Sequence, residues 1–191
     1  MGRRKTITDQ QLLDAAREVF TSGGFGASTK SVARAAGISE GVLFQRFHTK
    51  EELFLAAMVP PPIDVNRIFT HPDAEGQVLV RKVLFALTDY FRQTLPAFLP
   101  LLAHPSFRFE EFAARNPDTP LAALRRELTQ FAARLGSPSP GAAALLIWSV
   151  ANTVAFFERL GAHGGHLPDQ VIEEAVQTLW NGLQPAAKKK Q

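Results

Sequence analysis

The stretch VARAAGISEGVLFQRF, residues 32–47, decides the fold of this chain. Its apolar positions predict two short helices, and Gly37 lies between them, where a left-handed conformation that costs glycine little would end the first. Ser39 then suits the N-cap of the second helix, because its hydroxyl can accept a hydrogen bond from a free backbone N–H. Two helices joined so closely must cross steeply. The stretch therefore predicts a helix-turn-helix, whose second helix has a free face that fits the major groove of DNA.

Capping boxes mark further helices on both sides of this motif. The segment Thr8–Gln11 forms one box, and the helix that it opens has an apolar stripe and ends at Gly23-Gly24. The segment Thr49–Glu52 forms the second box, and the prolines at 60–62 stop its helix. We therefore expect a compact head of about fifty residues with a small core of its own.

Many spaced positions between Leu12 and Met58 agree with one known pattern: Ala15-Ala16, Phe20, Gly24-Phe25, Ser28-Thr29, Val32-Ala33, Ala36-Gly37-Ile38-Ser39, Gly41, Leu43-Phe44, Phe47 and Lys50-Glu51-Glu52-Leu53. With these residues the run closely resembles the N-terminal domain of TetR-family transcriptional regulators. The resemblance covers about a quarter of the chain. It implies an all-helical homodimer with a DNA-binding head and a larger body that binds a ligand and forms the dimer.

The expected fold class is all-α. We expect a three-helix helix-turn-helix DNA-binding head in residues 1–54, a helical ligand-binding and dimerisation body in residues 55–187, and a basic tail in residues 188–191. Residues 60–72 are predicted to form a loop, and a long, buried helix should follow from about residue 73 to residue 94. The prolines at 96, 100 and 105 are expected to break the next stretch into short pieces. Further helices are predicted at 120–135, 139–160 and 168–182.

The exposed side of the second motif helix supplies candidate DNA contacts. By hydrogen-bonding chemistry, Gln45 can pair with adenine, Arg46 with guanine or a phosphate, and Glu40 with cytosine. The resemblance implies contacts in the same region, and the full expected set is Ser28, Thr29, Lys30, Ser39, Glu40, Gly41, Phe44, Gln45, Arg46 and Lys50. Lys50 begins a helix, where its charge and the free backbone N–H groups both favour phosphate.

Three features depart from the family pattern. Position 44 is phenylalanine where the family usually has tyrosine, so a phosphate-binding hydroxyl is missing, and Phe44 is either a DNA contact or only a wedge of core. Arg46 replaces the common histidine or aromatic residue and is a candidate to restore the phosphate contact. The helix that begins at Lys50 is cut at Pro60, although in the family it connects head to body.

The body is rich in phenylalanine, which is consistent with ordinary core packing or with an apolar pocket that has a few polar groups. The candidate ligand-binding residues are Phe85, Asp89, Tyr90, Phe109, Phe112, Trp148, Asn152 and Phe156. The expected effector is a small hydrophobic or aromatic molecule, cationic if a carboxylate faces inward.

The last two predicted helices are candidates for the dimer interface, because the final helix has a continuous apolar stripe that needs a partner. By resemblance these helices pack against their copies in a second subunit. The expected interface residues are Leu146, Val150, Val154, Val171, Ala175, Leu179 and Leu183. Such a homodimer would hold two DNA-recognition helices about 34 to 36 Å apart, or a multiple of this, and select a palindromic operator.

Charge is uneven along the chain. Residues 1–54 hold eight basic and six acidic side chains, Lys188 to Lys190 add three positive charges, and residues 55–187 hold ten basic and twelve acidic side chains. The basic head suits phosphate contact. Arg3-Arg4-Lys5 is either an arm that enters a neighbouring groove or a solubilising tail.

Several other classes of protein fit less well. The chain has no cysteine, which excludes disulfides and thiolate metal sites, and its N-terminus lacks the apolar run of a secretion signal, so we expect a cytoplasmic protein. The uncharged window between Arg134 and Glu158 favours a buried interface helix over a membrane span, because residues 137–141 interrupt it. His163 and His166 lack a third metal ligand nearby.

Catalysis is also disfavoured. Residues Gly37 to Gly41 match G-x-S-x-G, but a nucleophile elbow requires a preceding strand, and an alanine-rich helix is predicted there. We therefore expect no enzyme and no cofactor. The sequence favours a DNA-binding repressor that is released from a palindromic operator by a small hydrophobic ligand. The alternative is a small-molecule-binding or catalytic helical protein without a role in gene regulation.

Overall fold

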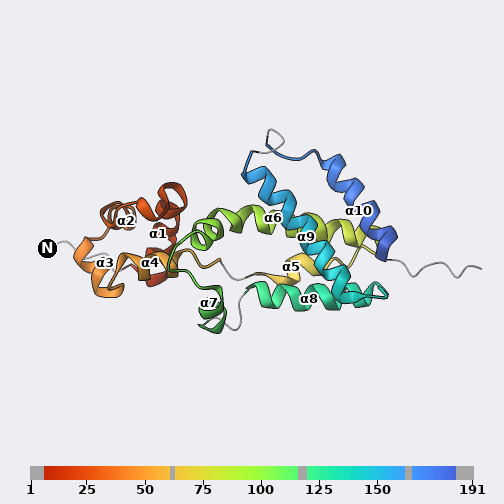
Figure 1. The fold of residues 1–191 in the computed structure, drawn as a ribbon, viewed down its shortest axis with the longest axis horizontal. Helices are drawn as coiled ribbons and strands as arrows, with labels where there is room; N and C mark the ends of the chain where they lie inside the picture. The colour runs from red at the N-terminus through yellow and green to blue at the C-terminus, as the bar shows by residue number, and fades with distance from the viewer. Residues whose placement is uncertain (1–6, 61–62, 116–119, 162–164, 184–191) are drawn as a thin grey trace, which may run out of the picture. The chain divides into compact units, whose positions relative to one another are not determined.

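The computed structural model describes residues 7–60, 63–115, 120–161 and 165–183, and within these ranges it is all-α, as predicted. Arg3-Arg4-Lys5, His163 and the tail 188–191 lie outside the described residues. In chain order the elements are α1 (Asp9–Gly23), the 3₁₀ turn η1 (Gly24–Gly26), α2 (Thr29–Ala36), α3 (Glu40–Arg46), α4 (Lys50–Ala57), α5 (Val65–Phe69), α6 (Gly76–Leu102), α7 (Phe109–Arg115), α8 (Pro120–Arg134), α9 (Pro140–Arg159) and α10 (Asp169–Leu183) (Figure 1).

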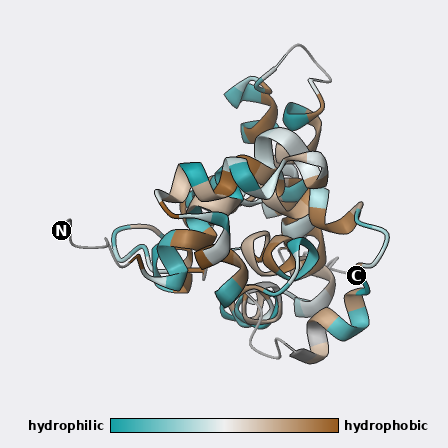
Figure 2. Ribbon diagram, turned by 90° about the vertical axis from the view of Figure 1, so that its left-hand side faces the viewer, coloured by the Kyte–Doolittle hydropathy of each residue, from teal (hydrophilic) through white to brown (hydrophobic). Residues whose placement is uncertain are grey.

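The helices fall into two compact units. The first unit consists of residues 1–60 and 96–114, and the second consists of residues 61–95 and 115–191. The division falls within α6, between Leu95 and Pro96. Figure 2 shows hydrophobic and hydrophilic residues interleaved along the helices, as expected for helices that bury one face.

The turn of the helix-turn-helix has the predicted geometry. Gly37 is left-handed, with φ +69° and ψ 30°. Its N–H donates to the carbonyl of Arg34 at 3.1 Å, and the N–H of Ile38 donates to the carbonyl of Ala33 at 3.0 Å. These two bonds form a Schellman motif, which satisfies carbonyls at the end of α2. Because the chain reverses locally in this way, α3 can begin three residues later.

The predicted N-caps of the head are also present. Thr8 and Gln11 form a complete capping box, with both reciprocal bonds between side chain and backbone. Thr49 accepts from the N–H of Glu52 at 3.0 Å, but the carboxylate of Glu52 accepts from the N–H of His48 rather than from that of Thr49. The second box is therefore displaced by one residue, and α4 is short, as predicted.

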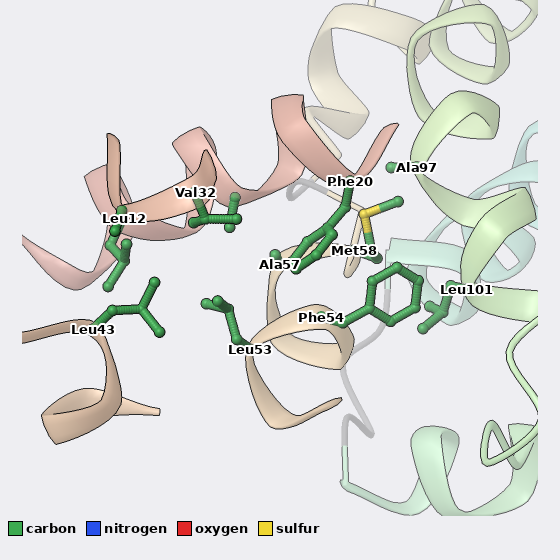
Figure 3. Packing of buried hydrophobic residues seen from close by; sticks show 12 residues of the cluster. Leu12, Phe20, Val32, Leu43, Leu53, Phe54, Ala57, Met58, Ala97 and Leu101 are labelled. Carbon is green, nitrogen blue, oxygen red and sulfur yellow. The ribbon is translucent and has the colours of Figure 1, made fainter. Parts of the chain in front are cut away.

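A single apolar cluster holds the first unit together (Figure 3). Its buried members are Leu12, Ala16, Phe20, Val32, Ala33, Leu43, Leu53, Phe54, Ala57, Met58, Ala97 and Leu101. Each of α1 to α4 contributes, so the helix-turn-helix is fixed by long-range packing as well as by its turn. The last two members come from the end of α6, so this part of the chain belongs to the core of the head.

The predicted end of the long helix at residue 94 is wrong. α6 continues to Leu102 with Pro96 and Pro100 inside it, although each proline removes one helical hydrogen bond and costs about 3 kcal/mol. Ala97 and Leu101 are buried in the first unit, and their packing offsets part of this cost. The loop predicted for 60–72 also contains a helix, α5, which Asp64 caps and which is too short to show periodicity.

In the second unit, α8 and α9 pack side by side, and α9 is tied to α6 by an ion pair between Arg92 and Glu158. Gly136 and Gly161, both with positive φ, follow the ends of α8 and α9 as predicted. Ser139 occupies the predicted cap position of α9, but its side chain makes no capping hydrogen bond. α10 ends at Leu183, one residue beyond the prediction.

By length and composition, one helix of the described residues, α9, is apolar enough to cross a membrane, and 33% of its most apolar window is buried. A single such helix is weak evidence for a membrane protein, because buried and interface helices of soluble proteins share these properties. α9 does, however, leave Leu145 and Leu146 exposed by 65% and 55%.

Candidate nucleic-acid interface

α3 exposes one face to solvent and packs the other against the apolar cluster of the first unit. Leu43 is fully buried in the apolar cluster, and Phe47 packs against the same cluster. Glu40, Gly41, Phe44 and Gln45 are exposed. These positions lie one helical turn apart or next to each other, so they form one continuous outer surface of a short helix. Such a surface has the size and shape that a major groove admits.

Phe44 is not a wedge of core. Its side chain is 40% exposed, because it follows Leu43 directly and is rotated by about 100° around the helix axis from that buried position. The exposed ring is available for contact with a thymine methyl group or with the sugar and phosphate backbone.

Three of the expected DNA-binding side chains, Arg46, Thr29 and Glu40, already have partners. Arg46 forms an ion pair with Asp9 through Nη1 and Oδ1 at 3.0 Å, and Thr29 donates from Oγ1 to Oε1 of Glu40 at 2.7 Å. The first contact joins α3 to the start of α1, and the second joins α3 to α2. Both pairs brace the motif, and both would have to rearrange or be shared for these groups to bind DNA. By contrast, Gln45 has no hydrogen-bond partner in the described part of the chain.

The expected serines act as helix caps. Ser28 accepts from the N–H of Ser31 at 3.1 Å, and Ser39 accepts from the N–H of Val42 at 3.3 Å. A hydroxyl that accepts one hydrogen bond keeps its own proton as a donor. The hydroxyl of Ser39 can therefore cap α3 and donate to a phosphate at the same time, whereas the hydroxyl of Ser28 is also bonded to that of Ser31.

Cations surround this surface. Lys30 and Arg34 are exposed on α2. Lys50, the first residue of α4, places Nζ 4.7 Å from the centroid of the Phe25 ring. Arg34, Asp9 and Phe25 were not among the expected site residues. The local pattern does not show that Asp9 contacts Arg46 or that Phe25 contacts Lys50, because these partners are distant in the sequence. The exposure of Arg34 on an amphipathic helix was predictable.

The expected ligand-binding residues do not form one cluster. Phe109 and Phe112 are in α7, and Phe112 packs against the apolar cluster of the first unit. In the second unit, Trp148 packs edge-on against Phe91 with ring centroids 5.0 Å apart. Phe156 and Phe85 contact a neighbouring ring and the Arg81 guanidinium, respectively.

Asp89 and Tyr90 do line one cavity. Its volume is about 240 Å³, and its lining consists of Ile63, Asp64, Arg67, Ile68, Ala86, Asp89, Tyr90, Gln93 and Thr94. The hydroxyl oxygen of Tyr90 is buried and has no hydrogen-bond partner among the described residues, and burial raises the pKa of this phenol to about 12. A buried hydroxyl without a partner has a desolvation cost, which a bound acceptor would relieve. A more open hollow of about 460 Å³ beside α5 and α8 contains none of the expected residues.

The expected dimer residues divide by burial. Leu146 and Val171 are exposed by 55% and 43%, whereas Val154, Leu179 and Leu183 are at least 92% buried within this one chain. Val150 and Ala175 are half-buried. The buried members of this set are therefore part of the core of the second unit, and the exposed members are available to contact another surface.

The structure also locates His166 and Ser39, which sequence patterns associate with metal binding and catalysis, respectively. The described residues contain no group of three or more His, Asp or Glu side chains that could hold a metal ion. His166 lies 3.1 Å from Glu158 through Nδ1. Ser39, in the G-x-S-x-G match, is preceded by α2 rather than by the strand that a nucleophile elbow requires.

Comparisons with known proteins agree with this arrangement. Residues 12–57 match the family described as "Bacterial regulatory proteins, tetR family". Over 56 residues the chain is 39% identical to the HTH-type transcriptional repressor AcnR of Corynebacterium glutamicum, a match that spans 29% of this chain and 30% of that protein.

Solved structures extend the similarity to the whole fold. A TetR-family regulator from Mesorhizobium loti has a TM-score of 0.67 at 17% identity, with 92% of this chain and 94% of that chain covered. A transcriptional regulator from Rhodococcus has a TM-score of 0.64 at 21% identity, with coverage of 93% and 96%. The flavonoid-responsive regulator FrrA also has a TM-score of 0.64, at 24% identity, with coverage of 93% and 97%. At sequence identities of 17% to 24%, the similarity shows a shared fold.

Proposed function

We propose that this chain, a TetR-family transcriptional regulator, is a homodimeric repressor which leaves a palindromic operator when a small hydrophobic ligand binds to its body. The observation that carries the proposal is α3, a short capped helix that buries Leu43 and exposes Gln45 beside the cations of α2 and α4. Residues 1–54 are the proposed DNA-binding domain. The protein would act in the cytoplasm, where its operator lies.

Base recognition is assigned to α3. Gln45 is exposed and free to pair bidentately with adenine in the major groove. Arg46 would exchange its ion pair with Asp9 for a phosphate oxygen, which has the stronger local field of the DNA backbone. Because one phosphate contact contributes about 0.9 to the salt slope, we expect Arg46→Ala to lower that slope by about one. If the salt slope is unchanged, Arg46 does not contact phosphate and only joins α3 to α1 through its ion pair with Asp9.

The proposed dimer uses the exposed apolar side chains of α9 and α10. Leu145, Leu146 and Phe157 on α9, Leu160 at its C-cap and Val171 on α10 are 39% to 65% exposed in the single chain. Pairing of these helices with their copies would cover this surface and give a four-helix interface. A two-fold axis would then relate two heads, and this symmetry requires an operator whose half-sites are inverted repeats.

The effector is assigned to the cavity beside Tyr90. An aromatic or hydrophobic molecule with a hydrogen-bond acceptor would pack against Ile63, Ile68 and Ala86, which share the lining with several polar and charged side chains, and would satisfy the buried hydroxyl of Tyr90. The flavonoid-responsive regulator with the same fold makes phenolic ring compounds a sensible first panel. A volume of about 240 Å³ suits a small ring system. The effector would release DNA by favouring a conformation in which the two heads no longer match the operator.

Sequence selection from random duplex DNA with the purified full chain tests the DNA-binding part. We expect an inverted repeat to be enriched, and Gln45→Ala to relax the preference at one base pair of each half-site at a cost of about 1–3 kcal/mol. Enrichment of no sequence would favour the alternative of a small-molecule-binding protein without a regulatory role. Thermal melting with the ring-compound panel then tests the effector, and Tyr90→Phe is the matched control that keeps the ring and removes the hydroxyl.

A further inference from the structure

Three side chains from distant parts of the chain form a stack at the edge of the first unit. Nζ of Lys50 lies 4.7 Å from the centroid of the Phe25 ring. The Phe25 ring meets the imidazole of His104 edge-on, with centroids 4.4 Å apart. Phe54, which is fully buried, contacts both rings at 5.2 and 5.1 Å. A cation at the start of α4 is thus connected, through one exposed ring, to the segment that follows α6.

The backbone of Phe25 does little to fix its ring. Phe25 occupies the middle of η1 between Gly24 and Gly26, and Gly24 has φ +60°. Neither glycine has other atoms within 4 Å of the position that a Cβ would take, so this turn is loosely surrounded. The ring is also 38% exposed. Its position therefore depends on the aromatic neighbours, Phe54 and His104.

His104 is itself well anchored. It is only 8% exposed, and its backbone donates to the carbonyl of Leu101 at 3.1 Å and accepts from the N–H of Phe107 at 2.9 Å. Its Nδ1 accepts from the N–H of Ser106 at 3.3 Å, which holds the ring plane. These bonds make the imidazole a fixed support against which the loosely surrounded turn of Phe25 can rest.

We propose that His104 is a positioning residue for DNA binding: it holds Phe25 as a platform that keeps the ammonium group of Lys50 in place for a backbone phosphate. This inference rests on the proposed function, in which Lys50 contacts DNA. A lysine side chain has many rotamers, and holding it before the encounter lowers the ordering cost of binding. The ring covers one side of the ammonium group, so N–H donors remain for a phosphate oxygen.

A purely structural role explains the stack less well. The packing of α4 is supplied by its buried residues Leu53, Phe54 and Ala57, and Lys50 adds nothing to that core. An exposed cation–π contact contributes little to stability, but the same contact changes affinity when it selects the binding-competent rotamer. The two roles therefore predict different results in DNA binding.

The experiment measures operator affinity against salt concentration for the full chain and its variants His104→Ala, His104→Phe, Lys50→Ala and the double variant His104→Ala/Lys50→Ala. We expect His104→Ala to weaken binding about two- to fivefold and to lower the salt slope by up to about one. His104→Phe keeps a ring at this position and should restore both. The double variant should match Lys50→Ala, because His104 acts only through Lys50.

A second measurement follows the stack without DNA. The ε-methylene protons of Lys50 should resonate upfield in the wild-type protein because of the Phe25 ring current, and they should move toward free-lysine values in His104→Ala but not in His104→Phe. Arg126→Ala, which removes an exposed cation of α8, is the control for nonspecific charge loss and should leave the salt slope unchanged.

The outcomes separate the inference from the proposed function. Wild-type protein that selects no DNA sequence would refute the proposed function and the phosphate contact with it. A further outcome is that the wild type binds specifically while His104→Ala lowers operator affinity by the same factor with Lys50 present and with Lys50→Ala. That result would refute the positioning role and leave the proposed function intact. The positioning role is refuted in the same way if His104→Ala leaves the Lys50 protons unshifted.

Discussion

Glu158→Gln should destabilise the second unit in a way that depends on pH. Glu158 is 7% exposed, and its carboxylate accepts from Nε and Nη2 of Arg92 at 2.7 and 2.8 Å. It also accepts from the N–H of Leu167 at 3.0 Å and contacts His166. The hydrogen bonds from Arg92, reinforced by those from His166 and Leu167 and opposed by burial, lower the pKa of Glu158 from 4.5 to about 2.

The magnitude follows from this shift. A difference of about 2.5 pKa units corresponds to about 3 kcal/mol of folding free energy at neutral pH. Because the folded pKa is below the unfolded one, the contribution is complete above about pH 4.5 and disappears as the pH falls toward about 2. About 40% of it should remain at pH 3. Glutamine keeps the shape of the side chain but leaves Arg92 without its buried anion.

Urea unfolding followed by tryptophan fluorescence measures this effect, since both tryptophans, Trp148 and Trp180, belong to the second unit. Asp89→Asn is the matched control: Asp89 also pairs with Arg92, at 2.8 Å, but its side chain is 60% exposed, so we expect a loss below about 1 kcal/mol. A loss for Glu158→Gln that is equally large at pH 7 and pH 3 would refute the reasoning, because a neutral packing effect does not titrate.

Three other substitutions test separate parts of the fold and the site. Gly37→Ala should lower the free energy of unfolding by about 1–2 kcal/mol in thermal or urea unfolding, because φ is +69° at this position. No atom lies within 4 Å of the new Cβ, so a loss well above that range would contradict the geometry. Leu43→Ala should cost about 2–5 kcal/mol and reduce operator binding in a gel shift, since this fully buried side chain seats α3. Tyr90→Phe should leave stability unchanged or raise it by up to about 1 kcal/mol, because it removes a buried hydroxyl without a partner. A clear loss in melting temperature would show that the hydroxyl is hydrogen-bonded.

The proposed operator contacts illustrate how far local pattern reaches. The sequence identified α3 and its capped start from residues that are neighbours in the chain, and the exposed Gln45 follows from helical spacing alone. It did not show that Arg46 pairs with Asp9, 37 positions away, or that Thr29 and Glu40 are bonded to each other. A side chain's availability for DNA depends on such partners, which helical periodicity does not encode.

The two prolines of α6 show the same limit for secondary structure. Pro96 and Pro100 are locally unfavourable in a helix, and on local grounds alone the helix should have ended before them. Burial of Ala97 and Leu101 among residues from α1 to α4 adds a long-range free energy that the local pattern does not contain. The likeness of residues 12–57 to the TetR family was visible in the sequence because those positions are close together.

What the sequence by itself determined is therefore the set of local decisions: the left-handed Gly37, the caps at Thr8, Ser39 and Thr49, and the amphipathic helices between them. Each depends on backbone preferences and hydrogen bonds within a few residues. Only the tertiary structure decided which side chains meet, as in the stack of Lys50, Phe25 and His104 and in the cavity beside Tyr90. Those contacts join segments far apart in the chain, and their free energy arises only when the whole unit packs.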